Sequence, residues 1–332
     1  MRNNKTAIIG CGAVFDQFQL PALKKIKNTP TVFIDINKDL AETYANKYNG
    51  SFASNHLELL DEYDTAIVSV PHFLHAPICK DLLNNNKHVF IEKPFVPHIE
   101  DALELIALAK EFNNTICVGN FRRYKNGTLW VKKLIETGAL GDIKEFHFRE
   151  GGVYSWPATT NSFWDKKKAC GGVLMDTGAH TIDQLCYLLG EANVIEYKDD
   201  SNGGVEADCF IELQLENGAK GTVDLSRTRN IGSSAIIKGS EGDLILDLLS
   251  GSIRTNPIGL LDFERDGIIG RGIKTEPYID LFVMQFTAWF NAIKSGSDDY
   301  IKGEDVVPSI KIISQCYKMK KQLSYGWVEN WI

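Results

Sequence analysis

The sequence predicts an α/β fold: a doubly wound parallel sheet in the N-terminal domain, followed by an α+β domain with a large, mostly antiparallel open sheet. Three observations support this prediction. Short apolar runs alternate with helical patterns up to residue 120, strand-like segments with little helix between them follow residue 190, and the chain has 332 residues. Because domains hold about 100–200 residues, we expect two of them, at residues 1–120 and 121–332.

The first 120 residues alternate between strand and helix patterns. Apolar, β-rich segments predict strands at residues 6–9, 31–36, 65–70, 88–91 and 115–118. The intervening patterns predict helices at residues 13–26, 38–48, 76–83 and 99–112. Strands that are apolar throughout are typical of a parallel sheet that helices cover on both faces, so we expect a doubly wound domain.

Strands dominate the second domain. Strand patterns occur at residues 143–149, 194–197, 207–215, 220–226, 235–238 and 244–248. Helices are predicted at residues 128–136, 178–189, 281–294 and 304–322. Turn sequences such as Asn217-Gly218 separate the strands and favour hairpins, which predicts a largely antiparallel sheet.

Composition and charge exclude several classes of function. The 36 basic and 43 acidic residues give a net charge of −7, and the tightest basic run, Lys166-Lys167-Lys168, is too short for a phosphate-backbone interface, so we expect no nucleic-acid partner. Neither a signal-peptide core nor a run of about 18 apolar residues occurs, which predicts a cytoplasmic protein without a membrane partner. The seven cysteines contain no CxxC pair and are expected to be reduced, buried thiols.

A glycine-rich turn follows the first predicted strand. Gly10-Cys11-Gly12-Ala13-Val14-Phe15 begins a G-x-G-x-x-G fingerprint, with Phe15 in place of the third glycine. The first glycine permits a tight turn, the second lets a pyrophosphate approach the backbone at the helix N-terminus, and the third permits close packing of helix and strand. The motif indicates dinucleotide binding, with a purely structural strand–helix turn as the alternative.

Asp35 ends the second predicted strand, 25 positions after Gly10. At a spacing of about 20, an acidic residue accepts hydrogen bonds from the adenine-ribose diol. Its carboxylate would repel a 2′-phosphate, and the adjacent Ile36 and Asn37 offer no cation, so NAD is favoured over NADP. Lys38 keeps NADP possible, and Asp35 has the alternative role of starting the turn or capping the next helix.

The segment Glu92-Lys93-Pro94 follows the predicted strand 88–91. A lysine at the carboxyl end of a parallel strand lies where α/β sheets bind ligands. The alternative is an ordinary exposed lysine before a turn-forming proline.

Asp176, His180 and Asp183 are spaced at i, i+4 and i+7 and would share one face of a helix. A carboxylate there can hold a substrate hydroxyl, and an imidazole can take up its proton. Alternatively, Asp176 or Thr177 caps the helix and His180 is a half-buried structural residue. No metal is expected, because an HExxH motif and a cysteine partner are both absent from the sequence.

Four sets of residues occur in order along the chain: Gly10-Cys11-Gly12, Val70-Pro71-His72 with His75, Lys87-His88-Val89 leading to Glu92-Lys93-Pro94, and Gly171-Gly172 leading to Asp176 and His180. Together they resemble the Gfo/Idh/MocA oxidoreductases, the family of glucose-fructose oxidoreductase and inositol dehydrogenase. The resemblance is strongest over residues 5–190. It implies a Rossmann domain followed by an α+β domain whose open sheet forms contacts in a homodimer or homotetramer.

The resemblance also implies roles for individual residues. Lys93 would contact the nicotinamide ribose and the substrate hydroxyl, Asp176 would bind substrate, and His180 would transfer the proton. Asn120 would lie near the cofactor and Arg123 near the substrate. Other implied cofactor contacts are Gly10, Cys11, Gly12, Ala13, Val14, Phe15, Asp35, Ile36, Val70, Pro71, His72, His75 and Glu92. A cis peptide bond is implied before Pro94.

The implied function is reversible, NAD(P)-dependent oxidation of a secondary hydroxyl on a sugar, cyclitol or sugar derivative, with Lys93, Asp176 and His180 as catalytic residues. Two alternatives stay open: an NAD-dependent glycoside hydrolase that uses transient oxidation, and a nonenzymatic regulator that senses a dinucleotide. Tyr154, Trp156 and Trp164 could form an aromatic wall for a sugar ring, with core packing as the alternative. The apolar C-terminus, residues 327–332, is expected to dock on its own chain or on another subunit.

Overall fold

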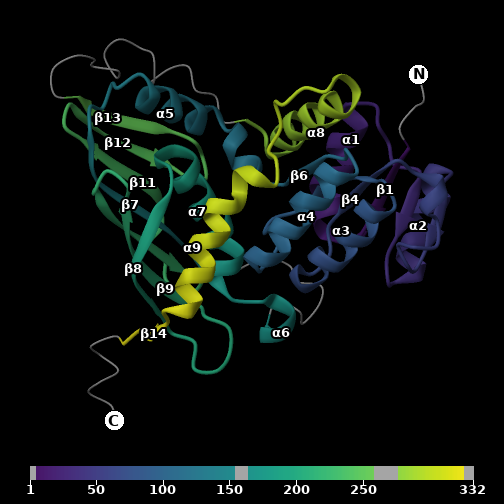
Figure 1. Cartoon of the computed structure of the whole chain (residues 1–332), viewed down its shortest axis with the longest axis horizontal. Helices are drawn as coiled ribbons and strands as arrows, with labels where there is room; N and C mark the ends of the chain where they lie inside the picture. The colour runs from purple at the N-terminus through teal and green to yellow at the C-terminus, as the bar shows by residue number, and fades with distance from the viewer. Residues whose placement is uncertain (1–4, 154–163, 258–275, 325–332) are drawn as a thin grey trace. The chain divides into compact units, whose positions relative to one another are not determined.

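The computed structural model describes residues 5–153, 164–257 and 276–324 (Figure 1). Tyr154, Trp156 and the apolar C-terminus lie outside these ranges. The chain forms two compact units. The first consists mainly of Met1–Phe121 and Pro277–Val307, and the second mainly of Arg122–Trp156, Phe163–Glu276 and Pro308–Ile332. Among the helices of the described ranges, none is both long enough and apolar enough to cross a bilayer.

The first unit contains a six-stranded sheet in the order β3-β2-β1-β4-β5-β6. Its strands are β1 (Thr6–Ile9), β2 (Val32–Ile34), β3 (Ser51–Ala53), β4 (Thr65–Val68), β5 (His88–Ile91) and β6 (Ile116–Val118). Every strand pairing is parallel, which confirms the predicted doubly wound sheet. The strand order reverses between β1 and β4, and such a switch point is where open α/β sheets bind ligands.

The helices of the first unit are α1 (Leu20–Lys25), α2 (Lys38–Tyr48), α3 (His75–Asn84), α4 (Ile99–Glu111) and α8 (Tyr278–Ser295) (Figure 1). A π-helical turn, η1 (Phe15–Gln19), precedes α1, and the Leu20 N–H donates to the Phe15 carbonyl. Pro21 has no N–H to continue the regular helical ladder, which accounts for the wide turn immediately before it. The predicted helix 13–26 is therefore present but irregular.

Helix α8 belongs to the first unit although it comes late in the chain. The rings of Phe286 and Trp289 on α8 lie 4.8 and 5.8 Å from that of Phe90 on β5. The indole N–H of Trp289 donates to the Thr115 hydroxyl at 2.8 Å. The helix therefore completes the apolar cover of this sheet.

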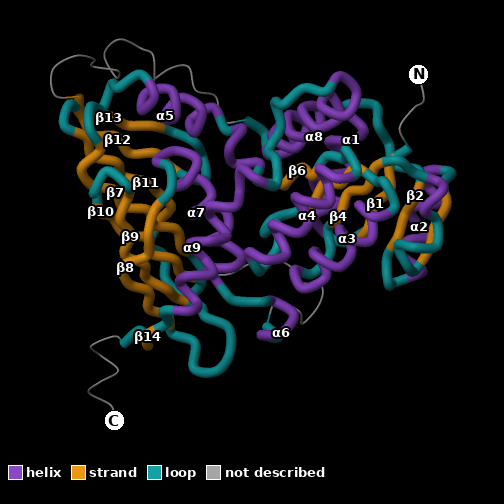
Figure 2. Tube along the Cα trace, viewed as in Figure 1, coloured by secondary structure: helices purple, strands orange, loops and turns teal. Residues whose placement is uncertain are grey.

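The second unit contains an eight-stranded sheet in the order β13-β12-β11-β7-β10-β9-β8-β14 (Figure 2). Its strands are β7 (Ile143–Gly151), β8 (Ala192–Asp199), β9 (Asp208–Leu215), β10 (Lys220–Ser226), β11 (Gly232–Gly239), β12 (Gly242–Asp247), β13 (Ile253–Pro257) and β14 (Lys321–Gln322). Most pairings are antiparallel, while β7–β10 and β8–β14 are parallel. The predicted mostly antiparallel sheet is thus confirmed.

Helices α5 (Asn126–Glu136), α6 (Lys166–Ala169), α7 (Val173–Leu189) and α9 (Val307–Lys318) complete the second unit. Alternate residues of the strands, such as Phe146 and Phe148 of β7, are buried in one apolar core together with Ile182 of α7 and Ile312 of α9. The central helix α7 therefore lies against the sheet along its length, and this packing fixes the orientation of the polar residues in its first two turns.

Candidate active site

Loops that follow the parallel strands carry most of the predicted residues of the first unit. Gly10 follows β1, Asp35 follows β2, and Val70 comes shortly after β4. Glu92 and Lys93 follow β5, and Asn120 comes shortly after β6. Because the carboxyl ends of parallel strands meet at one edge of a sheet, the fold brings all of these loops to the same edge.

The turn after β1 is built for a close approach. Gly10 has φ +96°, and a Cβ there would lie 2.3 Å from the Ser69 carbonyl oxygen. A Cβ on Gly12, in contrast, would meet no atom within 4 Å. The Cys11 N–H donates to Asp35 Oδ2 at 2.8 Å, which ties this turn to the end of β2. Gly10 is therefore needed for the fold, while Gly12 leaves open space over the backbone.

Phe15 takes a structural role. Its ring is fully buried, with its centre 6.2 Å from that of Phe33 and 5.1 Å from that of Tyr44. The third glycine of the fingerprint is thus replaced by a core aromatic residue on the π-helical turn. A direct contact of the Phe15 side chain with a cofactor, as the resemblance implied, does not fit this burial.

A buried polar cluster lies beneath the same edge. Gln19 Nε2 donates to Ser69 Oγ at 2.8 Å and to Glu92 Oε1 at 2.7 Å, and the Ser69 hydroxyl donates back to Gln19 Oε1 at 3.0 Å. Burial raises the pKa of Glu92 to about 7, although the Gln19 hydrogen bond and the Lys93 charge oppose the shift. Glu92 therefore supports the edge from below and is 8% exposed.

Lys93 is half-buried and is followed by a cis peptide bond to Pro94, as implied by the resemblance. His75 joins this turn to the turn after β4, with Nδ1 2.8 Å from the Pro94 carbonyl and Nε2 2.9 Å from the Val70 carbonyl. Burial lowers the pKa of His75. Both ring nitrogens face backbone carbonyls and the residue is fully buried, so the predicted direct cofactor contact of His75 is corrected to a structural one.

The edge fits a nicotinamide dinucleotide. Asn120 is 4% exposed, and no donor in the described ranges reaches its Oδ1. A buried acceptor without a partner is costly, which indicates that a ligand donor completes it. Gly12, Asp35 and Asn120 are the residues that would hold the cofactor. Other predicted contacts follow the same strands and are half-buried or, for Ile36, exposed: Ala13, Val14, Ile36, Val70, Pro71 and His72.

In the second unit, α7 begins at Val173, earlier than the predicted residue 178. Glu206, which precedes β9, explains the difference: its Oε1 accepts the N–H of Gly172 at 2.8 Å and that of Leu174 at 3.1 Å. A Cβ on Gly172 would lie 1.9 Å from the Glu206 carbonyl oxygen. The Tyr317 hydroxyl of α9 also donates to Glu206 Oε1 at 2.8 Å. The glycine pair therefore lets a distant acid cap the helix N-terminus, where its charge is favourable.

The two carboxylates of the predicted helix face have different partners. Asp176 Oδ2 accepts from Arg227 Nη2 at 2.7 Å. Asp183 accepts from Arg123 in a bidentate pair of 2.9 and 2.6 Å, with the Asp183 side chain 1% exposed. His180, one turn after Asp176, is buried. Arg123 pairs with the buried Asp183, and its implied role in substrate binding stays a prediction.

Three functional residues were missed from the sequence: Gln19 in the first unit, and Glu206 and Arg227 in the second. For Arg227 a local signal existed, since it directly follows the predicted strand 220–226. Trp164 is half-exposed, and Arg227 Cζ lies 5.9 Å from the centre of its ring. Within the described ranges, no cluster of three or more His, Cys, Asp or Glu side chains is arranged to bind a metal.

Comparison with known proteins identifies the family of this chain. Residues 4–120 match the model of an oxidoreductase family with an NAD-binding Rossmann fold, and residues 132–329 match the C-terminal alpha/beta domain of the same family. An uncharacterized oxidoreductase of Schizosaccharomyces pombe is 29% identical over 228 residues, which are 65% of this chain and 61% of that protein. The glucose-6-phosphate 3-dehydrogenase of Bacillus subtilis is 31% identical over 192 residues, 55% of this chain and 53% of that protein. Both matches thus span less than two thirds of the relative.

Solved structures share the fold. The WlbA dehydrogenase of Bordetella pertussis, solved in complex with NADH and UDP-GlcNAcA, superimposes with a TM-score of 0.86 at 18% identity and covers 95% of both chains. The two family models together account for nearly the whole chain in the order that the fold shows. The protein therefore belongs to the Gfo/Idh/MocA oxidoreductase family, with the family's NAD-binding Rossmann domain as its first part.

Proposed function

We propose that this protein is an NAD-dependent dehydrogenase/reductase that interconverts a secondary hydroxyl and a ketone on a sugar, cyclitol or sugar derivative. The observation that carries the proposal lies at the edge of the first unit's sheet where the carboxyl ends of the parallel strands meet. There Gly12 leaves open space over the backbone, and Asn120 presents a buried acceptor. The names of the relatives support a sugar substrate, since one is a glucose-6-phosphate 3-dehydrogenase and another was solved with a sugar nucleotide.

When bound, the nicotinamide accepts or supplies the hydride. The residues of this chain position the substrate and move the proton. Lys93, half-buried at the end of β5, donates hydrogen bonds to the reacting hydroxyl and stabilises its developing negative charge. His180 takes the hydroxyl proton, because imidazole titrates nearest to neutral pH. Asp176 accepts a hydrogen bond from a substrate hydroxyl and fixes the orientation of the ring.

The position of Asp35 supports NAD over NADP. Its two carboxylate oxygens accept the N–H groups of Cys11 and Asn37, both at 2.8 Å, so the negative charge is fixed at the end of β2. Lys38 lies over the ring of Phe52, with Nζ 5.8 Å from the ring centre. The Asp35 carboxylate would repel a 2′-phosphate placed at the end of β2.

An absorbance assay for NADH formation tests the proposal. The purified protein and NAD are mixed with inositols, aldoses, sugar phosphates and sugar nucleotides, and the Lys93→Met protein is assayed beside it. We expect NADH from at least one substrate, and a loss of turnover of about 10²–10⁴-fold in Lys93→Met. Lys110→Met, a surface variant, serves as the control and is expected to retain full activity.

Each other outcome has a defined meaning. Near-normal turnover in Lys93→Met would refute the role of that lysine. Release of a glycoside leaving group without net NADH would instead indicate hydrolysis through transient oxidation. NAD binding without turnover on any panel member would favour a dinucleotide-sensing regulator. The expected homodimer or homotetramer stays a prediction, which light scattering of the same preparation tests.

A further inference from the structure

We propose that Arg227 is a substrate-binding residue and that, with Asp176, it selects an uncharged, polyhydroxylated ring. The proposal rests on the proposed function and narrows its substrate class. Arg227 Nη2 donates to Asp176 Oδ2 at 2.7 Å, with side chains that are 5% and 16% exposed. Trp164 lies over the same guanidinium. Three groups from separate segments of the second unit thus converge on one place.

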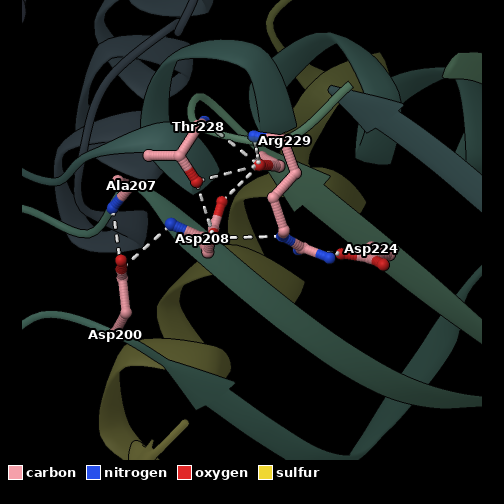
Figure 3. A network of polar contacts seen from close by, with 7 residues as sticks. Asp200, Ala207, Asp208, Asp224, Thr228 and Arg229 are labelled. Carbon is pink, nitrogen blue, oxygen red and sulfur yellow. Dashed lines mark hydrogen bonds and ion pairs between the residues drawn. The ribbon is translucent and has the colours of Figure 1, made fainter. Parts of the chain in front are cut away.

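The loop that carries Arg227 is held in advance of any ligand. Asp208, at the start of β9, accepts hydrogen bonds from Thr228 and Arg229, which follow Arg227 in the loop (Figure 3). It also accepts the hydroxyl of Ser226, the last residue of β10. Figure 3 also shows Asp200 accepting the backbone N–H groups of Ala207 and Asp208. The Arg227 N–H donates to the Ala207 carbonyl at 2.8 Å. Such preorganisation places the guanidinium without an ordering cost at the time of binding.

Contacts other than the ion pair also hold the helix and the loop. Glu206 caps the N-terminus of α7. Asp208, two residues later in the chain, holds the loop that carries Arg227. These three consecutive residues, 206–208, thus connect both partners of the Asp176–Arg227 pair. Buried ion pairs are a weak source of stability, because desolvation offsets the Coulomb attraction. A role in substrate binding accounts for a buried ion pair at a place where other contacts already hold the helix and the loop.

The charges indicate which ligand fits. The charges of Asp176 and Arg227 sum to zero, and so do those of Asp183 and Arg123, two turns further along the same helix. An anionic group would meet the Asp176 carboxylate, and a cationic group would meet the Arg227 guanidinium. A hydroxyl both donates and accepts, so neighbouring hydroxyls of one ring match the pair. The half-exposed indole of Trp164 offers an apolar face for the ring itself.

Calorimetric titration of the NADH-bound protein tests the proposal without requiring turnover. The probes are D-glucose, myo-inositol, D-glucuronate and glucose 6-phosphate. Arg227→Lys keeps the positive charge and removes the planar set of donors. Arg149→Lys, on the exposed side of β7, is the matched control. We expect an uncharged probe to bind to wild type at least about tenfold more tightly than both anionic probes. In Arg227→Lys, the affinity for this uncharged probe should fall by about tenfold or more.

Several results would overturn the proposal: tighter binding of an anionic probe, equal binding of the uncharged probe to Arg227→Lys and wild type, or no binding of either uncharged probe. Thermal unfolding checks that the variants fold. If Arg227→Lys does not fold, Trp164→Leu replaces it and is expected to weaken the same probe. Binding that depends on Arg227 without NADH formation would keep this inference and overturn the proposed function. NADH formation with binding insensitive to Arg227 would do the reverse.

Discussion

The two compact units position their candidate residues by different physical means. In the first unit, each residue follows a strand of one parallel sheet, so backbone topology brings the loops together. In the second unit, Asp176 and Asp183 lie on one helix, and their arginine partners are 51 and 60 residues away in the chain. The first arrangement depends on backbone geometry, and the second depends on side-chain charges buried in pairs.

This difference predicts different weak points. The arrangement in the first unit depends on the backbone, so it should be disrupted where an added Cβ clashes with a nearby backbone atom. Replacement of charged surface residues there should have little effect. A charge-built site fails when one partner of a buried pair is removed, because the other partner is left buried and uncompensated. The following variants test this contrast in order of expected effect.

The largest effect is expected from Asp183→Asn in the second unit. The change removes the carboxylate that faces Arg123 in a bidentate pair whose acid is 1% exposed. The free energy of unfolding, measured by urea denaturation, should fall by about 3–5 kcal/mol, because the guanidinium then stays buried without a counter-charge.

Asp142→Asn is the matched control for Asp183→Asn. Asp142 pairs with Lys144 at 3.1 Å, but both side chains are exposed. Its loss should change the free energy of unfolding by no more than about 0.5 kcal/mol. Equal effects of the two variants would contradict a second unit that depends on buried charge pairs.

In the first unit, two glycines separate folding from cofactor binding. Gly10→Ala places a Cβ 2.3 Å from the Ser69 carbonyl oxygen at φ +96° and should lower the free energy of unfolding by about 3 kcal/mol. Gly12→Ala places a Cβ in open space. This variant should keep the wild-type free energy of unfolding. Its affinity for NADH, measured by fluorescence titration, should fall about tenfold, because the methyl group enters the space for the pyrophosphate. Unchanged NADH affinity in Gly12→Ala would show that the dinucleotide does not pass over this glycine.

Much of the first unit could be predicted because its signals are local. The strands at residues 6–9 and 88–91 and the helix at residues 38–48 have the predicted bounds. The place of α8 could not be predicted, since an apolar helix face does not say which surface it covers. The π-helical turn before Pro21 was missed because a periodic pattern does not show a one-residue irregularity.

The second unit shows where local reasoning fails. The helix was predicted to begin at residue 178, but α7 begins at Val173, because Glu206 caps it from a distant segment. The shared face of Asp176 and His180 was visible in their spacing. The arginines that pair with its carboxylates were not, since long-range charge pairs leave no periodic trace in one sequence.

Glu92 gives the first unit a pH-dependent contribution to stability. Burial raises the pKa of Glu92 in the folded state from its ordinary value of about 4.5 to about 7, so the native state binds more protons than the unfolded state between these two pH values. The contribution of Glu92 to the free energy of unfolding is therefore fully present below about pH 4.5 and is lost as the pH rises through about 7. The neutral side chain of Glu92→Gln does not titrate. At pH 8 we therefore expect the free energy of unfolding of this variant, measured with urea, to be about 2–3 kcal/mol higher than that of wild type.

The pH series for Glu92→Gln contains its own control. Near pH 4.5 the native Glu92 is protonated, so wild type and Glu92→Gln should have similar free energies of unfolding there. An exposed acid shows no such pattern, and Glu111→Gln on α4 should follow wild type at both pH values. A constant difference between Glu92→Gln and wild type across the series would contradict the raised pKa and leave only a packing effect.

The smallest effect is expected at the adenine end of the dinucleotide edge. Asp35→Ser keeps an acceptor for the Cys11 N–H but removes the fixed negative charge at the end of β2. The ratio of NADPH to NADH affinity should shift toward NADPH by about tenfold, because the repulsion of the 2′-phosphate is lost. Asp39→Ser, an exposed acid in the first turn of α2, is the matched control and should keep the wild-type ratio. If both variants shift the ratio equally, the preference for NADH comes from the overall negative charge of this surface. The position of Asp35 at the end of β2 would then not be what distinguishes NADH from NADPH.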